Sequence, residues 1–168
     1  MSVTEKLVWM DLEMSGLDHE KERILEIATI ITDSSLKIIE EGPVLFVKQP
    51  KALLDAMDDW NKSHHSASGL IDLIDKEGVT EALAEQATLD FLKEHVAAGE
   101  SPLCGNSIGQ DRRFLIKYMP TLEAHLHYRN IDVSTVKELC RRWRPDIYEA
   151  LQKRGLHRAL DDIRESID

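Results

Sequence analysis

The run of residues 24–32 constrains the fold of this chain more than any other segment. Isoleucine, leucine or alanine occupies most of its positions, and a second apolar run at 7–10 ends at Asp11. Apolar runs of this length are far too short to cross a bilayer and are typical of strands buried in a sheet. The chain is therefore expected to fold around a sheet whose central strands are buried.

A third strand-like segment at 37–47 follows these two runs and is interrupted by Gly42-Pro43. Three strands in succession favour an antiparallel meander. Short helices are expected in 51–75, and a helix is expected from Thr80 to a glycine stop at Gly99. The predicted apolar face of that helix comprises Leu83, Ala84, Ala87, Phe91, Leu92 and Val96.

Strands and helices alternate in the second half of the chain. Short strands are expected at 102–104 and 130–132, and helices at 111–118, 135–143, 147–152 and from 159 onward. Strands that feed helices after an opening meander indicate an α/β fold. We expect a mixed sheet, first antiparallel and then parallel, with helices on both faces.

The bulk properties fit one domain spanning residues 1–168, with no secretory signal and no membrane span, which suggests a cytoplasmic protein. Cys104 and Cys140 form no metal or redox motif and are expected to be small core residues. The net charge of −10 argues against coating long nucleic acid, because that binding requires many cationic contacts to phosphate. A short nucleic-acid substrate is not excluded.

Asp11 and Glu13 lie two residues apart at the expected end of the first strand, so both point to one face. Two adjacent acids repel each other unless a cation or solvent intervenes. Oxygen ligands favour a hard ion such as Mg²⁺ or Mn²⁺ over zinc. Taken alone, this pair is better explained as an ordinary solvated strand end followed by the turn at Gly16.

Asp111 is expected in the first turn of a helix that follows a glycine-bearing loop, with Asn106 or Ser107 as the cap. The helix dipole alone favours an acid there. By the same ordinary reading, Arg112 and Arg113 form a solvated face.

His157 and Asp162 are five residues apart, so they do not share a helical face. If both serve one site, His157 precedes the helix and Asp162 lies inside it; Asp161 is the competing acid. A histidine in such a site suits the role of general base.

Two other enzyme classes fit the sequence poorly. The Asp11-Leu-Glu13 run resembles the nucleophile loop of haloacid-dehalogenase-like phosphatases, which use a second aspartate where this chain has Glu13 followed by Met14. The glycine-rich patterns that cradle nucleotide phosphates are absent.

The chain resembles the oligoribonucleases, which belong to the DEDDh branch of the 3′-to-5′ exonucleases. The resemblance lies in four stretches, namely WMDLEMSGLD from Trp9, CGNSIGQDRRFL from Cys104, DVST from Asp132 and HRALDDIRES from His157. It covers almost the whole chain and implies an RNase H-like fold. The His-x-x-x-x-Asp spacing assigns the fourth acid to Asp162.

The resemblance implies a two-metal mechanism. Asp11, Glu13, Asp111 and Asp162 are expected to hold two divalent cations, Mg²⁺ or Mn²⁺, and His157 to activate the attacking water. The implied substrates are single-stranded RNAs as short as a dinucleotide, and the products are 5′-mononucleotides.

The resemblance also implies a substrate site. Leu17 and Trp60 match residues placed against the bases, although ordinary core packing explains either one. The residues implied around the 5′ phosphate are His65, Ser107, Arg129, Ser134 and Thr135. Thr135 and Glu138 also fit a capping box.

Tyr128 is implied to reach the partner's site in a homodimer. Surface packing is the ordinary reading of Tyr128 and of His64. The chain ends at Asp168, short of the last helix that family members carry.

Two rival functions remain at this stage. One is a DNA-directed exonuclease of the same fold, and the other is a non-catalytic module that binds divalent metal.

Overall fold

The computed structural model describes residues 6–150 and 158–168. Its strands are β1 (Lys6–Met14), β2 (Ile24–Asp33), β3 (Ile38–Glu41), β4 (Leu45–Phe46), β5 (Leu103–Gly105) and β6 (Asn130–Asp132). Its helices are α1 (Lys51–Ala56), α2 (Asp59–Ala67), α3 (Leu70–Glu77), α4 (Glu81–His95), α5 (Ile108–Tyr118), α6 (Pro120–Glu123), α7 (Val133–Trp143), α8 (Pro145–Ala150) and α9 (Ala159–Ile167).

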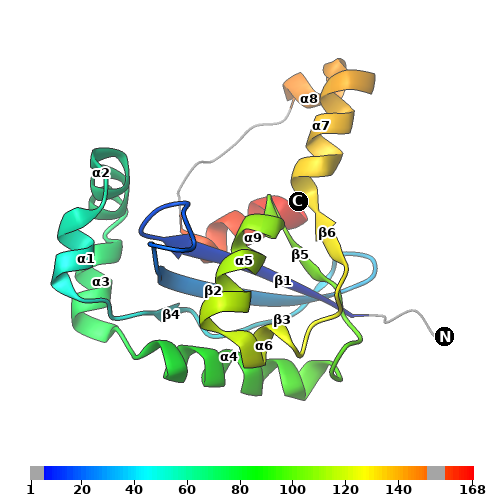
Figure 1. The fold of residues 1–168 in the computed structure, drawn as a ribbon. Helices are drawn as coiled ribbons and strands as arrows, with labels where there is room; N and C mark the ends of the chain where they lie inside the picture. The colour runs from blue at the N-terminus through cyan, green and yellow to red at the C-terminus, as the bar shows by residue number, and fades with distance from the viewer. Residues whose placement is uncertain (1–5, 151–157) are drawn as a thin grey trace.

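The strands form one mixed sheet in the order β3-β2-β1-β5-β6, with β4 also paired to β2 (Figure 1). The pairs β1–β2, β2–β3 and β2–β4 are antiparallel, whereas β1–β5 and β5–β6 are parallel. The expected meander followed by parallel strands is confirmed. Gly42-Pro43 separates β3 from β4, because proline cannot donate to a strand ladder.

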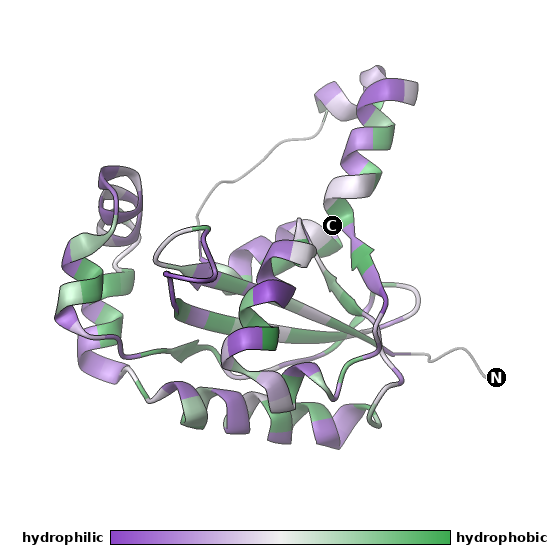
Figure 2. Cartoon of the chain, viewed as in Figure 1, coloured by the Kyte–Doolittle hydropathy of each residue, from purple (hydrophilic) through white to green (hydrophobic). Residues whose placement is uncertain are grey.

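The sheet is covered on both faces, as expected. Side chains alternate between the faces of a strand, so Val8, Met10 and Leu12 pack into a core with residues of α4 and α5. Trp9 points the other way, into a cluster that includes Ile163 of α9. In Figure 2 the central strands are largely green, whereas α2 is largely purple.

Two groups of helices lie away from the sheet centre. Helices α1–α3 lie at one end of the molecule, and α7 and α8 extend from the other (Figure 1). No residue of α7 is buried. In the part of the chain that the structure describes, no helix has both the length and the apolar character that a bilayer crossing requires.

Three sequence-based expectations are wrong in detail. Strand β1 continues past Asp11 to Met14, because its pairing with β2 extends that far. Helix α4 ends at His95, and Gly99, with a φ of 74°, lies in the turn beyond it. Cys104 is buried as expected, but Cys140 is only half-buried, because α7 projects from the body.

The buried face of α4 also differs from the predicted one. Leu83 is 52% exposed, whereas Thr88 and Leu89 are buried with Ala84 and Leu92. The apolar pattern identified the helix, but the direction in which it packs depends on the sheet beneath it.

Candidate active site

Three carboxylates meet on the face of the sheet that α9 covers. Asp11 and Glu13 share that face of β1 with Trp9, because side chains alternate along a strand. Asp162 comes from the first turn of α9. One oxygen from each of the three lies within 4.8 Å of the others, so the three residues could hold a metal ion together.

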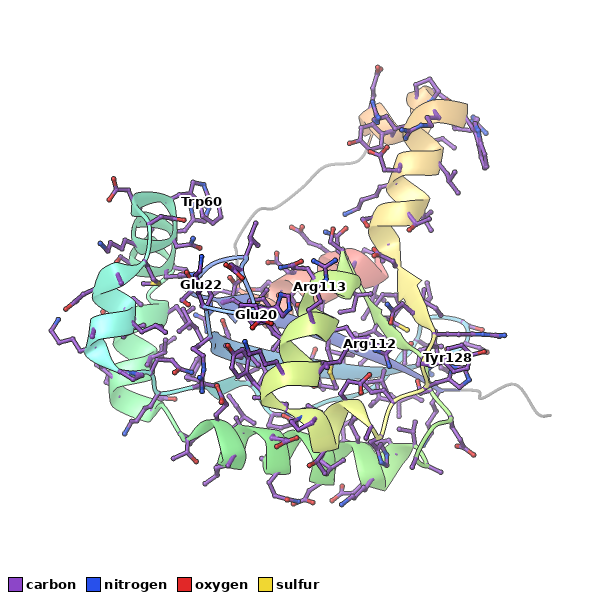
Figure 3. The ribbon with its side chains drawn as sticks, in the orientation of Figure 1. Glu20, Glu22, Trp60, Arg112, Arg113 and Tyr128 are labelled. Atoms are coloured by element: carbon purple, nitrogen blue, oxygen red, sulfur yellow. The ribbon has the colours of Figure 1, made fainter. Side chains whose placement is uncertain are left out.

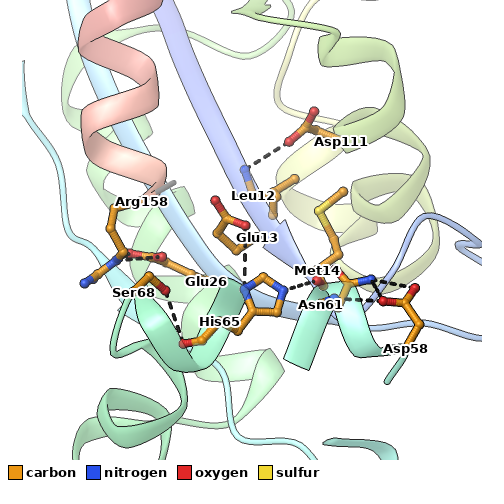
Figure 4. Close-up of polar contacts among 10 residues, drawn as sticks. All are labelled: Leu12, Glu13, Met14, Glu26, Asp58, Asn61, His65, Ser68, Asp111 and Arg158. Carbon is orange, nitrogen blue, oxygen red and sulfur yellow. Dashed lines mark hydrogen bonds and ion pairs between the residues drawn. The ribbon is translucent and has the colours of Figure 1, made fainter. Parts of the chain in front are cut away.

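Asp111 joins this cluster from α5. Its Oδ1 accepts a hydrogen bond of 2.9 Å from the backbone N–H of Leu12, between the two acids of β1 (Figure 4). Its charge is also the largest Coulombic contribution to the raised pKa of Asp11. The structure therefore brings Asp111 to the same site, although it is outside the three-residue group.

Burial and mutual repulsion shift the pKa values of these acids upward. Burial is the main cause for Asp11, whose pKa lies well above its usual value, and repulsion from Asp111 and Glu13 adds to it. Burial, then repulsion from Asp162, raises the pKa of Glu13 to about 8. Burial raises that of Asp111 to about 7, although the Leu12 N–H opposes the shift. A bound divalent cation would favour the ionised carboxylates.

The structure distinguishes Asp162 from its neighbour. The Asp161 carboxylate pairs with Arg164 of the same helix at 3.1 Å, whereas Asp162 is a member of the metal-ligand group. Helix α9 begins at Ala159, which puts Asp162 inside the helix as expected. His157, the predicted base, lies outside the described residues.

His65 lies beside Glu13. Its Nε2 donates to the Met14 carbonyl at 2.8 Å, and its Nδ1 is 4.0 Å from Glu13 Oε2 (Figure 4). The residue is 4% exposed, and burial lowers its pKa, which favours the neutral imidazole. These contacts put His65 at the Glu13 side of the acidic cluster, and its predicted role at the 5′ phosphate stays a prediction.

Glu26 and Arg158 were not identified from the sequence. Glu26 is fully buried in β2, directly opposite Glu13, and Arg158 Nη2 lies 3.0 Å from its Oε1. The sequence did contain a sign of this pair, since Glu26 is the one acid in the apolar run 24–32. A carboxylate buried in such a run requires a partner. Arg158 immediately precedes α9 and so connects that helix to the sheet beside the site.

Leu17 and Trp60 are exposed, so the core reading of both is wrong. Leu17 is 76% exposed on the loop between β1 and β2, and Trp60 is 61% exposed on α2. The Trp60 ring stacks on His64 with a centroid distance of 4.0 Å and an interplanar angle of 18°. Figure 3 shows Trp60 above that loop in this view. Both side chains are therefore open to solvent.

Asp132 organises part of the predicted phosphate site. Its Oδ1 accepts from the backbone N–H of Ser107 at 2.9 Å and from the N–H and hydroxyl of Ser134 at 2.9 and 2.6 Å. Asp132 is thus the N-cap of α7, and the predicted capping box of Thr135 and Glu138 is wrong. The helix begins two residues earlier than predicted because β6 leads directly into it. Thr135 therefore lies within its first turn.

Tyr128 and Arg129 lie on the segment before β6. Tyr128 is 75% exposed, and the Arg129 guanidinium lies over its ring at 5.6 Å. Trp60 and Tyr128 lie at opposite ends of the view in Figure 3. Tyr128 and Trp60 of the same chain are therefore far apart.

Arg112 is a buried structural residue, contrary to the expected solvated face. Its guanidinium donates to Glu123, to Asn130 and to the carbonyl of His127, at distances of 2.7–2.9 Å. It is 8% exposed. Arg112 thus ties α5 to the segment that carries Tyr128 and Arg129. Arg113 is exposed, as predicted.

Comparison with known proteins adds to this geometry. Residues 8–168 match the RNase_T family, described as exonuclease. An oligoribonuclease from Marinobacter nauticus is 61% identical over 168 residues, covering 100% of this chain and 93% of that protein. An oligoribonuclease from Bordetella pertussis is 60% identical over 163 residues, covering 97% of this chain and 90% of that protein.

Solved structures of exonuclease I share the fold. The enzyme from Methylocaldum szegediense has a TM-score of 0.69 at 20% identity, over 96% of this chain and 38% of that one. A zinc-bound complex of E. coli exonuclease I with single-stranded DNA has a TM-score of 0.63 at 17% identity, over 98% and 39%. The chain thus spans about two fifths of those exonuclease chains.

Proposed function

The chain belongs to the oligoribonucleases of the RNase_T exonuclease family, and from this membership we propose a metal-dependent enzyme that hydrolyses dinucleotides and very short RNA. It releases 5′-mononucleotides from the 3′ end. The observation that carries the proposal is the convergence of Asp11, Glu13 and Asp162 within 4.8 Å, with Asp111 bonded to the strand between the first two. We also propose that the enzyme acts in the cytoplasm.

The four carboxylates fit a pair of hard divalent cations. They offer only oxygen ligands, and burial makes them poorly stable as free anions. Two Mg²⁺ or Mn²⁺ ions bound there would promote ionisation of the attacking water and stabilise charge on the attacking and leaving oxygens.

The rest of the chemistry is assigned to the chain itself. His157 accepts the proton of the attacking water, as the His-x-x-x-x-Asp pattern implies. The new bond joins the water oxygen to phosphorus, the bond from phosphorus to the 3′ oxygen of the penultimate nucleotide breaks, and that 3′ oxygen takes up a proton from solvent water. His65, held neutral by burial beside Glu13, lines the acidic end of the site.

The substrate lies between two exposed surfaces in this proposal. Leu17 and Trp60 contact the bases, because aromatic and apolar surfaces accept any base with little sequence preference. The 5′ phosphate lies at Ser107, Arg129, Ser134 and Thr135. The start of α7 supports this placement, since helix N-termini attract anions.

We propose a homodimer in which Tyr128 of one subunit completes the site of the other. The support is an exposed apolar face on α7 and α8, here called the α7 face. It comprises Val136, Leu139, Trp143, Ile147 and Tyr148. Val136, Leu139 and Trp143 recur at the spacing of one helical face, and exposed apolar surface is typical of interaction sites.

The test compares mononucleotide release from a 5′-phosphorylated diribonucleotide and from a longer single-stranded DNA, with Mg²⁺ or Mn²⁺. We expect the diribonucleotide to be strongly preferred and chelation to stop the reaction. Loss of the 5′ phosphate should weaken affinity. Preference for the DNA would support the rival function, a DNA-directed exonuclease of the same fold. The solved complex of exonuclease I with single-stranded DNA has that fold. Metal binding without any hydrolysis would indicate the non-catalytic module.

A further inference from the structure

The loop between β1 and β2, residues 15–23, presents Leu17 to solvent at 76% exposure, so burial does not fix the position of this side chain. We propose that Gln110 of α5 is a positioning residue, which holds this loop so that Leu17 meets the substrate base at a set place relative to the acidic cluster. The inference rests on the proposed function.

The loop is closed on itself at its base. The Ser15 N–H donates to the Arg23 carbonyl at 3.0 Å, and the Arg23 N–H donates to the Ser15 hydroxyl oxygen at 3.0 Å. The Ser15 hydroxyl donates in turn to Glu22 at 2.5 Å. These bonds define the shape of the loop, but they do not attach its tip to the rest of the molecule.

Helix α5 makes that attachment. Three of its side chains, at positions 110, 117 and 118, donate to backbone carbonyls of the loop. Gln110 Nε2 donates to Leu17 at 2.5 Å, Lys117 Nζ to Glu20 at 3.2 Å, and the Tyr118 hydroxyl to His19 at 2.9 Å. Residues seven and eight apart lie on one helical face. One face of α5 therefore makes all three hydrogen bonds to the loop, at Leu17, His19 and Glu20. Figure 3 shows Glu20 of the loop beside α5.

The chemistry of the Gln110 amide fixes its orientation. A carbonyl only accepts, so the NH₂ group of Gln110 faces Leu17, and its Oε1 is left to accept from Arg113 Nη1 at 3.4 Å. Arg113 is exposed and has no part in the proposed reaction. Arg113→Met therefore offers a control that changes an exposed neighbour of Gln110 and leaves the bond between Gln110 and Leu17 in place.

Helix α5 links the two halves of the site. Asp111, the next residue, bonds to Leu12 between the two acids of β1. The same helical turn thus contacts the strand that carries the metal ligands and the residue that meets the base. Because a packed helix is stiff, the position of Leu17 relative to the acids is set by α5.

The experiment measures KM and kcat for a 5′-phosphorylated diribonucleotide with Mn²⁺. Gln110→Met keeps the length of the side chain and removes the donor. We expect KM to rise by about tenfold with kcat within about twofold, since one net hydrogen bond is worth about a factor of ten. Tyr118→Phe removes only the hydroxyl and should raise KM by about threefold. Arg113→Met should leave both constants unchanged.

A double-mutant cycle tests the route of the effect. If Gln110 acts through Leu17, then Gln110→Met combined with Leu17→Ala should have no higher KM than Leu17→Ala alone. Effects that multiply, or a fall in kcat with KM unchanged, would overturn the inference. If Gln110→Met does not fold, as judged by circular dichroism, Tyr118→Phe decides, and an unchanged KM there overturns it.

The wild-type chain separates this inference from the proposed function. If it releases no mononucleotide from the diribonucleotide, the proposed function fails. If it does so and Gln110→Met matches it in KM, only the positioning role of Gln110 fails.

Discussion

Glu13 and Glu26 lie directly opposite each other across β1 and β2, on the side of the sheet covered by α9. Like charges opposite each other in a sheet are destabilising, and Glu26 is fully buried. Arg158 compensates: its Nη2 lies 3.0 Å from Glu26 and its guanidinium lies 5.5 Å from the centre of the Phe46 ring. The acidic site thus lies beside an ion pair whose carboxylate is buried and whose guanidinium is partly exposed.

That pair predicts a loss of stability on mutation. Glu26→Gln leaves the Arg158 guanidinium without a carboxylate partner beside the sheet. Arg158 is partly exposed, so the free energy of unfolding should fall by about 1–3 kcal/mol, below the usual cost of breaking a fully buried pair. Urea denaturation measures it.

The control for Glu26 is Arg164→Gln, which removes the exposed pairs of Arg164 with Glu41 of β3 and with Asp161 of its own helix. It should change stability by less than about 1 kcal/mol. If Glu26→Gln is instead more stable than wild type, repulsion from Glu13 outweighs the Arg158 pair.

Asp162→Asn should abolish Mn²⁺-dependent release of mononucleotides, because it removes one carboxylate from the metal-ligand group. The same change should raise the Tm of the metal-free protein, since it removes a charge that repels Glu13. Chromatography measures the release of mononucleotides, and calorimetry in chelator measures the Tm of the metal-free protein.

Asp161→Asn is the matched control for that prediction, because its carboxylate pairs with Arg164 and not with the cluster. It should retain activity. Activity that survives Asp162→Asn but is lost in Asp161→Asn would reverse the assignment of the fourth acid.

The raised pKa values predict that the metal-free protein loses stability as pH rises. Glu13 is protonated up to about pH 8 in the fold but only to its usual value of 4.5 when unfolded, and Asp111 behaves likewise up to about 7. Unfolding between these two pKa values releases protons. The stabilisation is therefore fully present below the pKa of the unfolded state and is lost as pH rises through the pKa of the folded state.

Calorimetry in chelator between about pH 5 and about pH 9 should therefore show a falling Tm. Excess Mn²⁺ should flatten the slope, because the bound carboxylates stay ionised. A Tm that rises with pH in chelator would contradict the prediction that Glu13 and Asp111 are protonated in the metal-free fold.

The α7 face predicts the oligomeric state. Trp143 is 71% exposed on it, and Trp143→Glu should convert the dimer to monomers, because a charge at the centre of an apolar interface is costly. Sedimentation velocity measures this. Ile116→Glu places the same charge on exposed α5 and should leave the dimer intact. A monomeric wild type would contradict the proposed dimer.

Local pattern was sufficient for much of the fold. The apolar runs of β1 and β2, the break at Gly42-Pro43 and the N-cap at Thr80 each depend on neighbours in the chain, and all appear in the structure. The spacing of Asp11 and Glu13 set them on one face of a strand, because side chains alternate there.

Long-range packing decided the rest. Nothing local shows that Asp111 bonds to Leu12, ninety-nine residues away, or that His65 turns to Glu13. The cap of α7 falls on Asp132 and not Thr135, because β6 leads straight into the helix.

From the sequence came the central strands and most of the helices, since these follow from residue type and period, whereas the set of four acids came from the resemblance to the oligoribonucleases. Tertiary structure alone decided which face of the sheet α9 covers, and so which buried charges meet. Glu26 shows the difference: the sequence presents one acid in an apolar strand, and only the packing of α9 supplies Arg158 as its partner.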